Sequence, residues 1–211
     1  MEFSGTFELE HATVDEVWLA LSDPVLIADS LPGCEFLLRV DDPEDVDFDE
    51  LAERAEAESA ELSGDPEVIA ERAFQEGETY AALVGLSVGP VNPTFETVVT
   101  IIEREGRRMR AEGEGTSGDS TFEMSSWMEL EQDGDDVAVE WHTEADVFGR
   151  IANMGQRVIN PVANRVVKRF FSSVEDRLHD LSVDDVDEAG EAEDRGLLDR
   201  VLGRSKSNDS Q

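Results

Sequence analysis

Three histidines and one cysteine are the side chains of this chain that most often bind transition metals or act as nucleophiles. His11, His142 and His179 are far apart in the 211-residue sequence and share no ligand spacing, and Cys34 is the only cysteine. A zinc site would need further ligands that these residues do not supply. A single cysteine also excludes an intrachain disulfide. We therefore expect no metal centre, no intrinsic cofactor and no catalytic residue.

A glycine pattern, Gly113-x-Gly115-x-x-Gly118, formally matches the dinucleotide-binding fingerprint. That fingerprint leads from a strand into a helix whose amino terminus meets the pyrophosphate. Here the residues that follow, 119–131, alternate between polar and apolar as a strand does. The pattern therefore indicates a turn with small residues beside it. Because Asp and Glu together number 51, no single carboxylate pair identifies an acid–base couple, and an enzyme has no support from motifs.

The long helical stretch predicted over 149–180 is basic up to Glu175, the first acid in it. At 100° per residue, Arg150, Arg157 and Lys168 cluster on one flank, away from the apolar stripe. In a chain with a formal net charge of −34 this is the one basic surface. It either docks an anionic partner or neutralises the chain's own acidic segment, and the sequence favours neither.

A second candidate for docking lies near the C-terminal end. Residues 182–194 carry seven acids and no base, which predicts a solvated linker. The tail that follows, 195–211, is predicted to form a short amphipathic helix. Such a helix binds a protein groove or a membrane surface, or folds back on its own domain. Its large apolar residues are Leu197, Leu198, Val201 and Leu202.

A sheet and two short helices have to position these residues. Thr13 with Glu16 forms a capping box that begins one helix, and Asp23 followed by Pro24 begins a second. Between the later strands the connections are only two or three residues long, which predicts antiparallel hairpins. The strands predicted from period-two alternation are 2–10, 34–40, 78–88, 94–104, 107–116, 119–131 and 135–147.

The sheet and the last helix each have one apolar face, so the sheet must curl around the helix in an α+β domain. Along the strand 107–116 the inward residues shrink from Met109 through Ala111 to Gly113 and Gly115. Such a thinned wall leaves an apolar cavity between sheet and helix. The alternative is small-for-large packing in a filled core.

Length and charge limit the remaining choices. The chain suits one domain with an extension, and its acidity excludes nucleic acid as a main partner. Only Lys168 and Lys206 are lysines among 17 basic residues. Dense carboxylates with few lysines are typical of proteins that work in concentrated salt, and an ordinary acidic protein is the alternative. Residues 41–77, with 15 acids against Arg54 and Arg72, predict a weakly packed, acidic helical insertion.

The start of the chain has no signal-peptide pattern, and its longest nearly apolar run, 80–88, is far shorter than the roughly 20 residues that span a bilayer. We therefore expect a cytoplasmic protein, with peripheral contact at the inner face of the membrane as an open alternative.

Several short segments, in this order and spacing, resemble the CoxG family, that of the carbon monoxide dehydrogenase G subunit, in the SRPBCC (START/Bet v 1-like) superfamily. The segments span residues 1–40 and 78–180. They are Met1-Glu-Phe-Ser-Gly-Thr-Phe, Val14-Asp-Glu-Val-Trp, Leu31-Pro-Gly-Cys-Glu, Val88-Gly-Pro-Val and Phe148-Gly-Arg-Ile-Ala-Asn-Met-Gly-Gln-Arg running into Phe170-Phe.

The resemblance implies a helix-grip fold, in which a curved antiparallel sheet surrounds the C-terminal helix and an apolar cavity lies between them. It also implies an accessory protein of a molybdenum hydroxylase such as carbon monoxide dehydrogenase, with a quinone as a suggested ligand. The chain departs from the family twice: 41–77 replaces a tight hairpin, and the tail is not a long apolar anchor.

We accordingly expect a helix-grip domain over 1–181 that acts as a non-catalytic carrier of a quinone- or lipid-like molecule. The basic flank or the tail would engage the hydroxylase complex or the membrane. The alternatives are an enzyme of the same superfamily, cyclase- or hydrolase-like, and an assembly factor with a filled core. The expected cavity lining is Phe7, Phe95, Met109, Gly113, Gly115, Phe122, Met124, Trp141, Phe148, Ile151 and Met154.

Overall fold

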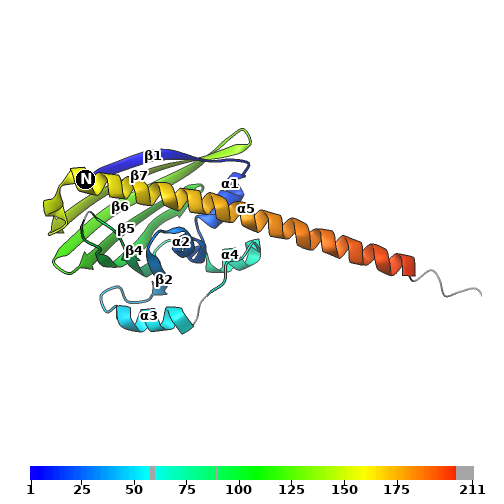
Figure 1. Ribbon diagram of the computed structural model, residues 1–211, viewed down its shortest axis with the longest axis horizontal. Helices are drawn as coiled ribbons and strands as arrows, with labels where there is room; N and C mark the ends of the chain where they lie inside the picture. Colours follow the sequence, from blue (N-terminus) through cyan, green and yellow to red (C-terminus); the bar gives the residue numbers. More distant parts are fainter. Residues whose placement is uncertain (58–59, 89, 203–211) are drawn as a thin grey trace, which may run out of the picture.

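A curved sheet of seven antiparallel strands dominates the fold (Figure 1). The computed structural model describes the backbone of residues 1–57, 60–88 and 90–202, and the side chains of these residues up to residue 180. The strand order is β1-β7-β6-β5-β4-β3-β2. All seven predicted strands are confirmed, with ends that differ by at most three residues. They are β1 (Glu2–Leu9), β2 (Cys34–Val40), β3 (Thr79–Gly85), β4 (Thr94–Glu105), β5 (Arg108–Ser117), β6 (Ser120–Asp133) and β7 (Asp136–Gly149).

Alternation along the strands gives the sheet an inner face, toward the C-terminal helix, and an outer face. Val99 of β4 lies opposite Gly113 of β5, which in turn lies opposite Met124 of β6. Met124 lies opposite Ala145 of β7. Directly paired residues share a face, and these four belong to the inner one. The next residue along each strand therefore faces outward.

Two short helices close one end of the sheet, α1 (Val14–Ala20) and α2 (Pro24–Ser30). The predicted capping box is present: the Thr13 side chain accepts from the Glu16 N–H, and the Glu16 carboxylate accepts from the Thr13 N–H at 2.8 Å. Asp23 caps α2 by accepting from the Val25 N–H at 3.0 Å. Both predicted helix starts are therefore confirmed.

The main core fills the half of the inner face beside these helices. Here Phe7 of β1 stacks on Phe171 of the last helix, with ring centroids 5.0 Å apart. These contacts hold the middle of that helix, α5 (Gln156–Leu202), against the sheet. The buried members of this core are Leu9, Val14, Val17, Ala20, Leu21, Leu26, Leu130, Val137, Val139, Phe171 and Val174.

The acidic segment 41–77 contains two helices, α3 (Phe48–Ala57) and α4 (Pro66–Arg72). The prediction that it is helical is confirmed, but the expected weak packing is wrong. Leu51 of α3 packs with Phe36 and Ala81 on the outer face of β2 and β3, and all three are buried. Farther along, Arg72 of α4 forms an ion pair with the fully buried Asp23 at 2.7 Å. The segment therefore covers part of the outer face and ends in the interior.

Helix α5 begins later and continues further than the sequence predicts. A short 3-10 turn, η1 (Ala152–Met154), and Gly155 with φ of 76° separate β7 from α5. Pro161 lies inside the helix, so the Asn160–Pro161 step neither interrupts nor restarts it. Residues 182–194, the predicted linker, are helical and continue α5, as do residues 195–202.

The last turns of α5 extend beyond the sheet (Figure 1). The rest of the predicted tail, 203–211, lies outside the described residues. No helix in the described part of the chain is long and apolar enough to cross a membrane.

Candidate ligand-binding site

The first turns of α5 pass in front of a part of the inner face whose residues belong to no core cluster found among the described residues (Figure 1). The chain enters this region beside β6, where the Ile151 N–H donates to the Ser120 hydroxyl at 3.1 Å, and reaches the main core at Phe171. Of the apolar side chains in between, Val167 and Phe170 pack against the main core, whereas others are half-buried and belong to none of the three core clusters found among the described residues. We call this region the inner site; it comprises Val99, Met124, Ser126, Thr143 and Ala145 of the sheet and Ile159, Val162 and Val166 of α5.

The polar groups of the inner site are few and already paired with one another. The Ser126 hydroxyl lies 2.8 Å from the Thr143 hydroxyl and 3.1 Å from the carbonyl oxygen of His142, to which it donates. Thr143 then donates to Ser126, so that the pair keeps only acceptor lone pairs for a ligand. At the start of α5, the buried Asn160 Oδ1 accepts no hydrogen bond from the described residues. The site therefore offers acceptors to a hydroxyl-bearing apolar molecule.

The two glycines that we expected to make room are explained by packing. A Cβ at Gly113 would stand 2.8 Å from the Met124 methyl, and a Cβ at Gly115 would stand 2.8 Å from Cζ of Phe122. Both neighbours come from β6, directly across the strand pair. At these positions the structure therefore has the small-for-large compensation that was the alternative to a cavity.

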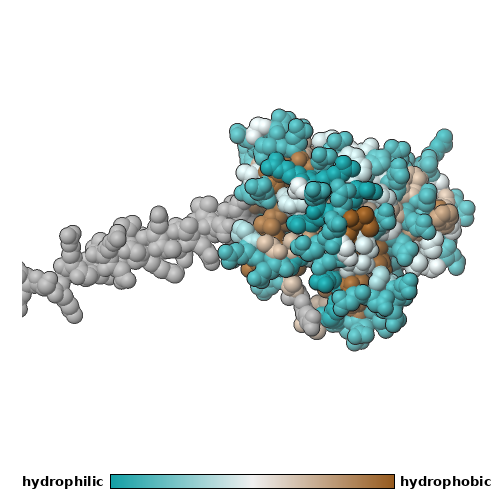
Figure 2. All heavy atoms as spheres, turned by 180° about the vertical axis from the view of Figure 1, so that it is seen from behind, coloured by the Kyte–Doolittle hydropathy of each residue, from teal (hydrophilic) through white to brown (hydrophobic). Residues whose placement is uncertain are grey.

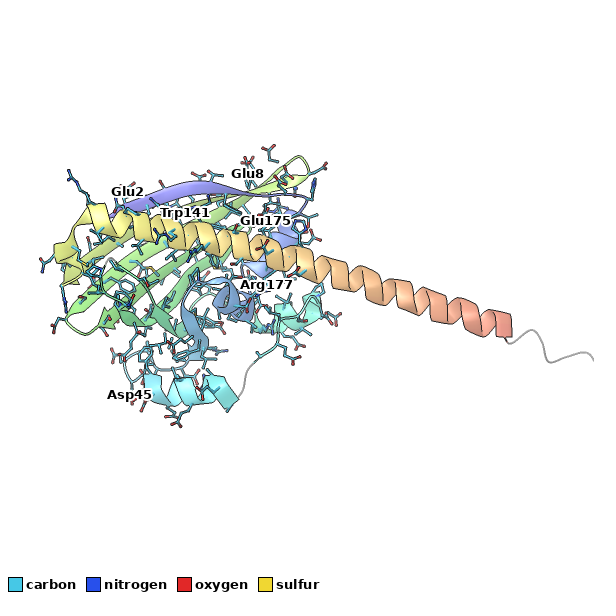
Figure 3. All side chains as sticks on the ribbon, in the orientation of Figure 1. Glu2, Glu8, Asp45, Trp141, Glu175 and Arg177 are labelled. Atoms are coloured by element: carbon cyan, nitrogen blue, oxygen red, sulfur yellow. The ribbon has the colours of Figure 1, made fainter. Side chains whose placement is uncertain are left out.

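The other expected lining residues do not form one cluster. Phe7 and Trp141 pack against the main core, and Trp141 lies beneath α5 (Figure 3). Met109 belongs to a second cluster with Phe74 and Tyr80. At the far end of the sheet, Phe95 meets Phe122 edge-on with centroids 5.4 Å apart. Close to the start of α5 lie the buried Ile151 and the half-buried Met154.

Phe148 is the one expected lining residue whose side chain lies on the outer face of the sheet. Its side chain is 55% exposed. Val147 lies opposite Phe122 on the inner face, so the next residue of β7 must face outward. The assignment of Phe148 to the cavity was therefore wrong, and alternation along β7 already contained the signal that corrects it.

The predicted docking residues fall into two groups. Arg150, Arg157 and Lys168 are exposed. Arg150, however, precedes η1, so it does not share a helical flank with the other two, contrary to the prediction. The backbone of the tail residues is part of α5, whereas their side chains lie outside the described ones; these are Leu197, Leu198, Val201 and Leu202.

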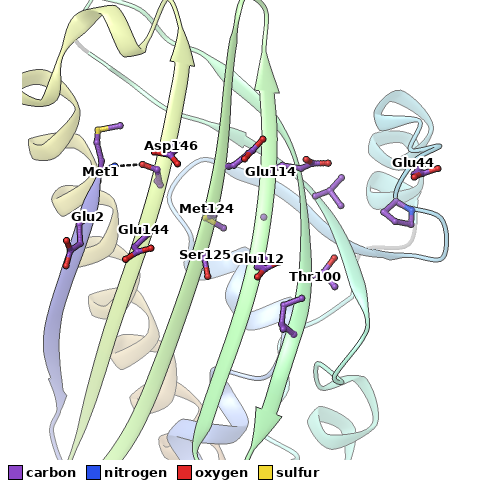
Figure 4. Close-up of a pocket in the computed structure, with 16 residues that line it drawn as sticks. Met1, Glu2, Glu44, Thr100, Glu112, Glu114, Met124, Ser125, Glu144 and Asp146 are labelled. Carbon is purple, nitrogen blue, oxygen red and sulfur yellow. Dashed lines mark hydrogen bonds between the residues drawn. The ribbon is translucent and has the colours of Figure 1, made fainter.

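A broad groove on the outer face had no signal in the sequence (Figure 4). It has a volume of about 1240 Å³ and runs across β1, β7, β6, β5 and β4 to the loop before α3. Its apolar lining is small and includes Ile102, which is 39% exposed. The rest of this side of the molecule is also largely hydrophilic (Figure 2). The carboxylates that line the groove are Glu2, Glu44, Glu112, Glu114, Glu123, Glu144 and Asp146.

Three of these carboxylates form a row across adjacent strands: Glu114 pairs with Glu123, and Glu123 pairs with Asp146. Like charges directly opposite each other destabilise a sheet. We expect Glu123→Gln to raise the free energy of unfolding by about 0.5–1 kcal/mol at low salt and to have little effect near 1 M salt, where the Debye length is about 3 Å. Urea unfolding at both salt concentrations measures this.

The matched control for this prediction is Glu131→Gln on the same strand. Glu131 is exposed and lies opposite Ala138. Glu131→Gln therefore removes the same charge as Glu123→Gln but relieves no repulsion from a carboxylate on the neighbouring strand. An equal gain in both variants would show that overall net charge, and not the row, sets the salt dependence.

The histidines and the cysteine are not brought together as a metal centre. His142 lies on the outer face, stacked on Trp127 with centroids 5.9 Å apart. Cys34 is half-buried, and burial raises its pKa to about 11, which keeps the thiol protonated. Within the described residues, no group of three or more His, Cys, Asp or Glu side chains is arranged to hold a metal ion.

Sequence reasoning did miss one proximity among these residues. His11 and His179 line the same small pocket, of about 60 Å³, between the β1–α1 turn and α5. His11 and His179 are far apart in the sequence, so their spacing gives no signal that they lie close together. The pocket is large enough for water only, so it does not change the candidate site.

Solved structures with the same fold confirm the helix-grip architecture. A conserved protein from Geobacillus kaustophilus matches with a TM-score of 0.63 and 19% identity, over 85% of this chain and 96% of that chain. The Zhui aromatase/cyclase from Streptomyces sp. R1128 matches with a TM-score of 0.55 and 12% identity, over 85% of this chain and 93% of that chain. A START superfamily protein from Mycobacterium smegmatis matches with a TM-score of 0.53 and 10% identity, over 85% of this chain and 98% of that chain.

At 10–19% identity these likenesses show the fold alone. They show the START-like arrangement of a curved sheet and a C-terminal helix. A search among curated proteins finds no match.

The amino-acid sequence also matches a known family. The family of the carbon monoxide dehydrogenase G subunit (CoxG) matches residues 72–179, which is more than half of the chain. The match runs from the end of α4 through the sheet strands β3 to β7 and the part of α5 that packs on the sheet. It therefore covers both walls of the inner site, and the chain belongs to the CoxG family.

Proposed function

We propose that this protein is a non-catalytic accessory protein that holds a quinone- or lipid-like molecule in the inner site and serves a molybdenum hydroxylase of the carbon monoxide dehydrogenase type. The family and the START-like fold support a hydrophobic-ligand-binding or accessory role. The quinone- or lipid-like ligand and the molybdenum hydroxylase partner go beyond that support and are our proposal.

One observation carries the ligand part. Apolar side chains on the sheet, such as Met124, and on α5, such as Ile159 and Val166, face the same region without joining a core cluster among the described residues. Half-buried apolar side chains beneath a helix are unfavourable in water. An apolar ligand that covers them gains about 25 cal/mol for each Å² removed from water.

The polar atoms of the inner site support a ligand with a hydroxyl group at one end. Ser126 and Thr143 retain acceptor lone pairs that a donor on the ligand would use. A quinol or a lipid alcohol has both the apolar body and the donor.

The outer groove is the less suitable place for such a ligand, although it is large. Its carboxylates would have to lose water against an apolar molecule, which is costly for charged groups. The hydroxyls of the inner site, by contrast, are paired with each other and with backbone. Among the described residues, none of their hydrogen-bond partners is an imidazole or a carboxylate, which supports a binding role over a catalytic one.

Native mass spectrometry with organic extraction, on protein purified from its native host, tests this proposal. We expect close to one apolar molecule per chain, and uptake of a short-chain ubiquinone by protein that has been stripped of ligand. A folded protein that carries nothing and takes up neither quinone nor lipid would contradict the carrier and favour the assembly factor.

A further inference from the structure

The outward face of α5 is basic and has no ion-pair partner in the described structure. Four of its side chains between residues 157 and 169 are cationic and exposed, and they span about 18 Å at 1.5 Å per residue. Among the described residues, none of the four lies within 4 Å of a carboxylate. We call this surface the basic face; its cations are Arg157, Arg165, Lys168 and Arg169.

The structure removes one intramolecular explanation for these charges, which is pairing with the acidic helix α3. The acidic helix α3 packs on Phe36 and Ala81, on the outer face of the sheet, whereas α5 lies on the inner side. The carboxylates of α3 are therefore separated from the basic face by the sheet itself. Among the described residues of a chain with 51 acids, these four cations have no carboxylate within 4 Å, which favours a partner outside the chain.

We propose that the basic face docks onto an acidic patch of a partner protein. Three of its four cations are arginines, whose planar guanidinium groups bind carboxylates through two parallel hydrogen bonds. The apolar side of α5 is already packed toward the sheet, so this face has no large apolar side chain to insert into a bilayer. A second copy of the chain, with its own charge of −34, would be repelled overall.

This inference rests on the proposed accessory role, because it names the chemistry of the partner's surface. It does not depend on the bound ligand: the basic face points away from the inner site. Neutralising the basic face should therefore leave quinone uptake unchanged, so the two proposals fail separately.

Photo-crosslinking in cells of the native host tests the proposal. The photoreactive residue p-benzoylphenylalanine replaces Asn164, which is exposed among the four cations, or, as a matched control, Thr121, which is exposed on β6. We expect adducts at position 164 with protein segments rich in Asp and Glu, and at least a tenfold loss of these adducts in R165Q/K168Q/R169Q.

A second charge control separates the basic face from overall charge. R54Q/R107Q/R108Q removes three exposed arginines elsewhere and should retain the adducts at position 164. Lipid adducts, adducts between two copies, adducts that survive R165Q/K168Q/R169Q, or no adduct at position 164 would each overturn the proposal. Thermal unfolding and ubiquinone uptake confirm that the variants are folded.

Discussion

Replacing Arg72 with methionine should lower the free energy of unfolding by about 3 kcal/mol. Arg72 Nη2 lies 2.7 Å from Oδ2 of Asp23, whose side chain is fully buried. Methionine keeps much of the apolar stem but leaves the Asp23 carboxylate without its counter-charge. Removing one partner of a buried pair costs about 3–5 kcal/mol, and we take the lower end because Arg72 is 22% exposed. Urea unfolding at fixed pH and salt measures the loss.

The matched control is Arg39→Met, which removes a surface ion pair of similar length. Arg39 lies 2.8 Å from Glu78, but its side chain is 60% exposed, so the expected loss is at most about 1 kcal/mol. Equal losses in the two variants would contradict the buried-pair explanation.

A double variant identifies the source of the loss. Asp23→Asn keeps a side chain that can cap α2 and removes the charge. If the cost of Arg72→Met arises from the unpaired Asp23 carboxylate, the double variant should be more stable than Arg72→Met alone. No recovery would mean that the contacts of the arginine, including its bond to the Glu61 carbonyl at 3.0 Å, carry the stability.

Most of the fold could be predicted because the sheet has a two-residue repeat with one apolar face. Alternation located all seven strands, and side-chain caps at Thr13 and Asp23 located the starts of α1 and α2. Each of these signals is local. The pairing of β1 with β7, by contrast, joins the two ends of the sheet sequence, and no local signal indicates it.

The packing of α3 had a signal that the prediction did not use. β2 has consecutive apolar residues, Phe36, Leu37 and Leu38, which place apolar side chains on both faces of the strand. A strand that is apolar on both faces is covered on both. Phe48 and Leu51 of the acidic segment supply that second layer. High acidity alone therefore did not indicate weak packing.

The candidate site was predicted only in outline, because a cavity depends on how side chains from distant strands fill space. The shrinking residues of β5 predicted a cavity beside its glycines, but Met124 and Phe122 occupy that room. Which residue fills such a gap is decided by pairing across β5 and β6, and not by either strand alone. The inner site lies instead between the sheet and the first turns of α5.

The second large effect is expected from two neighbouring serines of β6 that face opposite ways. Ser126 lies in the inner site, and Ser125 lines the outer groove. Ser126→Phe should lower the affinity for a short-chain ubiquinone at least a hundredfold. A ring that displaces about 120 Å² of ligand contact removes about 3 kcal/mol at 25 cal/mol per Å². Ser125→Phe adds the same ring to the other face and should leave uptake unchanged.

Stability distinguishes an open inner site from a filled one. Ser126→Ala removes the hydrogen bond to Thr143 without adding volume, so it reports that loss alone, about 1 kcal/mol. In an open site the phenyl ring enters free space, and Ser126→Phe should unfold at nearly the same urea concentration as Ser126→Ala. In a filled core the ring overpacks its neighbours and costs a further 1–3 kcal/mol or so.

The three variants together assign the ligand to one face of the sheet. Loss of uptake in Ser126→Phe with unchanged stability relative to Ser126→Ala is the result that the carrier requires. If Ser125→Phe loses uptake instead, the ligand binds in the acidic groove. If Ser126→Phe is overpacked and the parent protein takes up no ligand, the results favour the assembly factor. The test is placed on the inner face because both walls of the inner site lie within the residues that match the family.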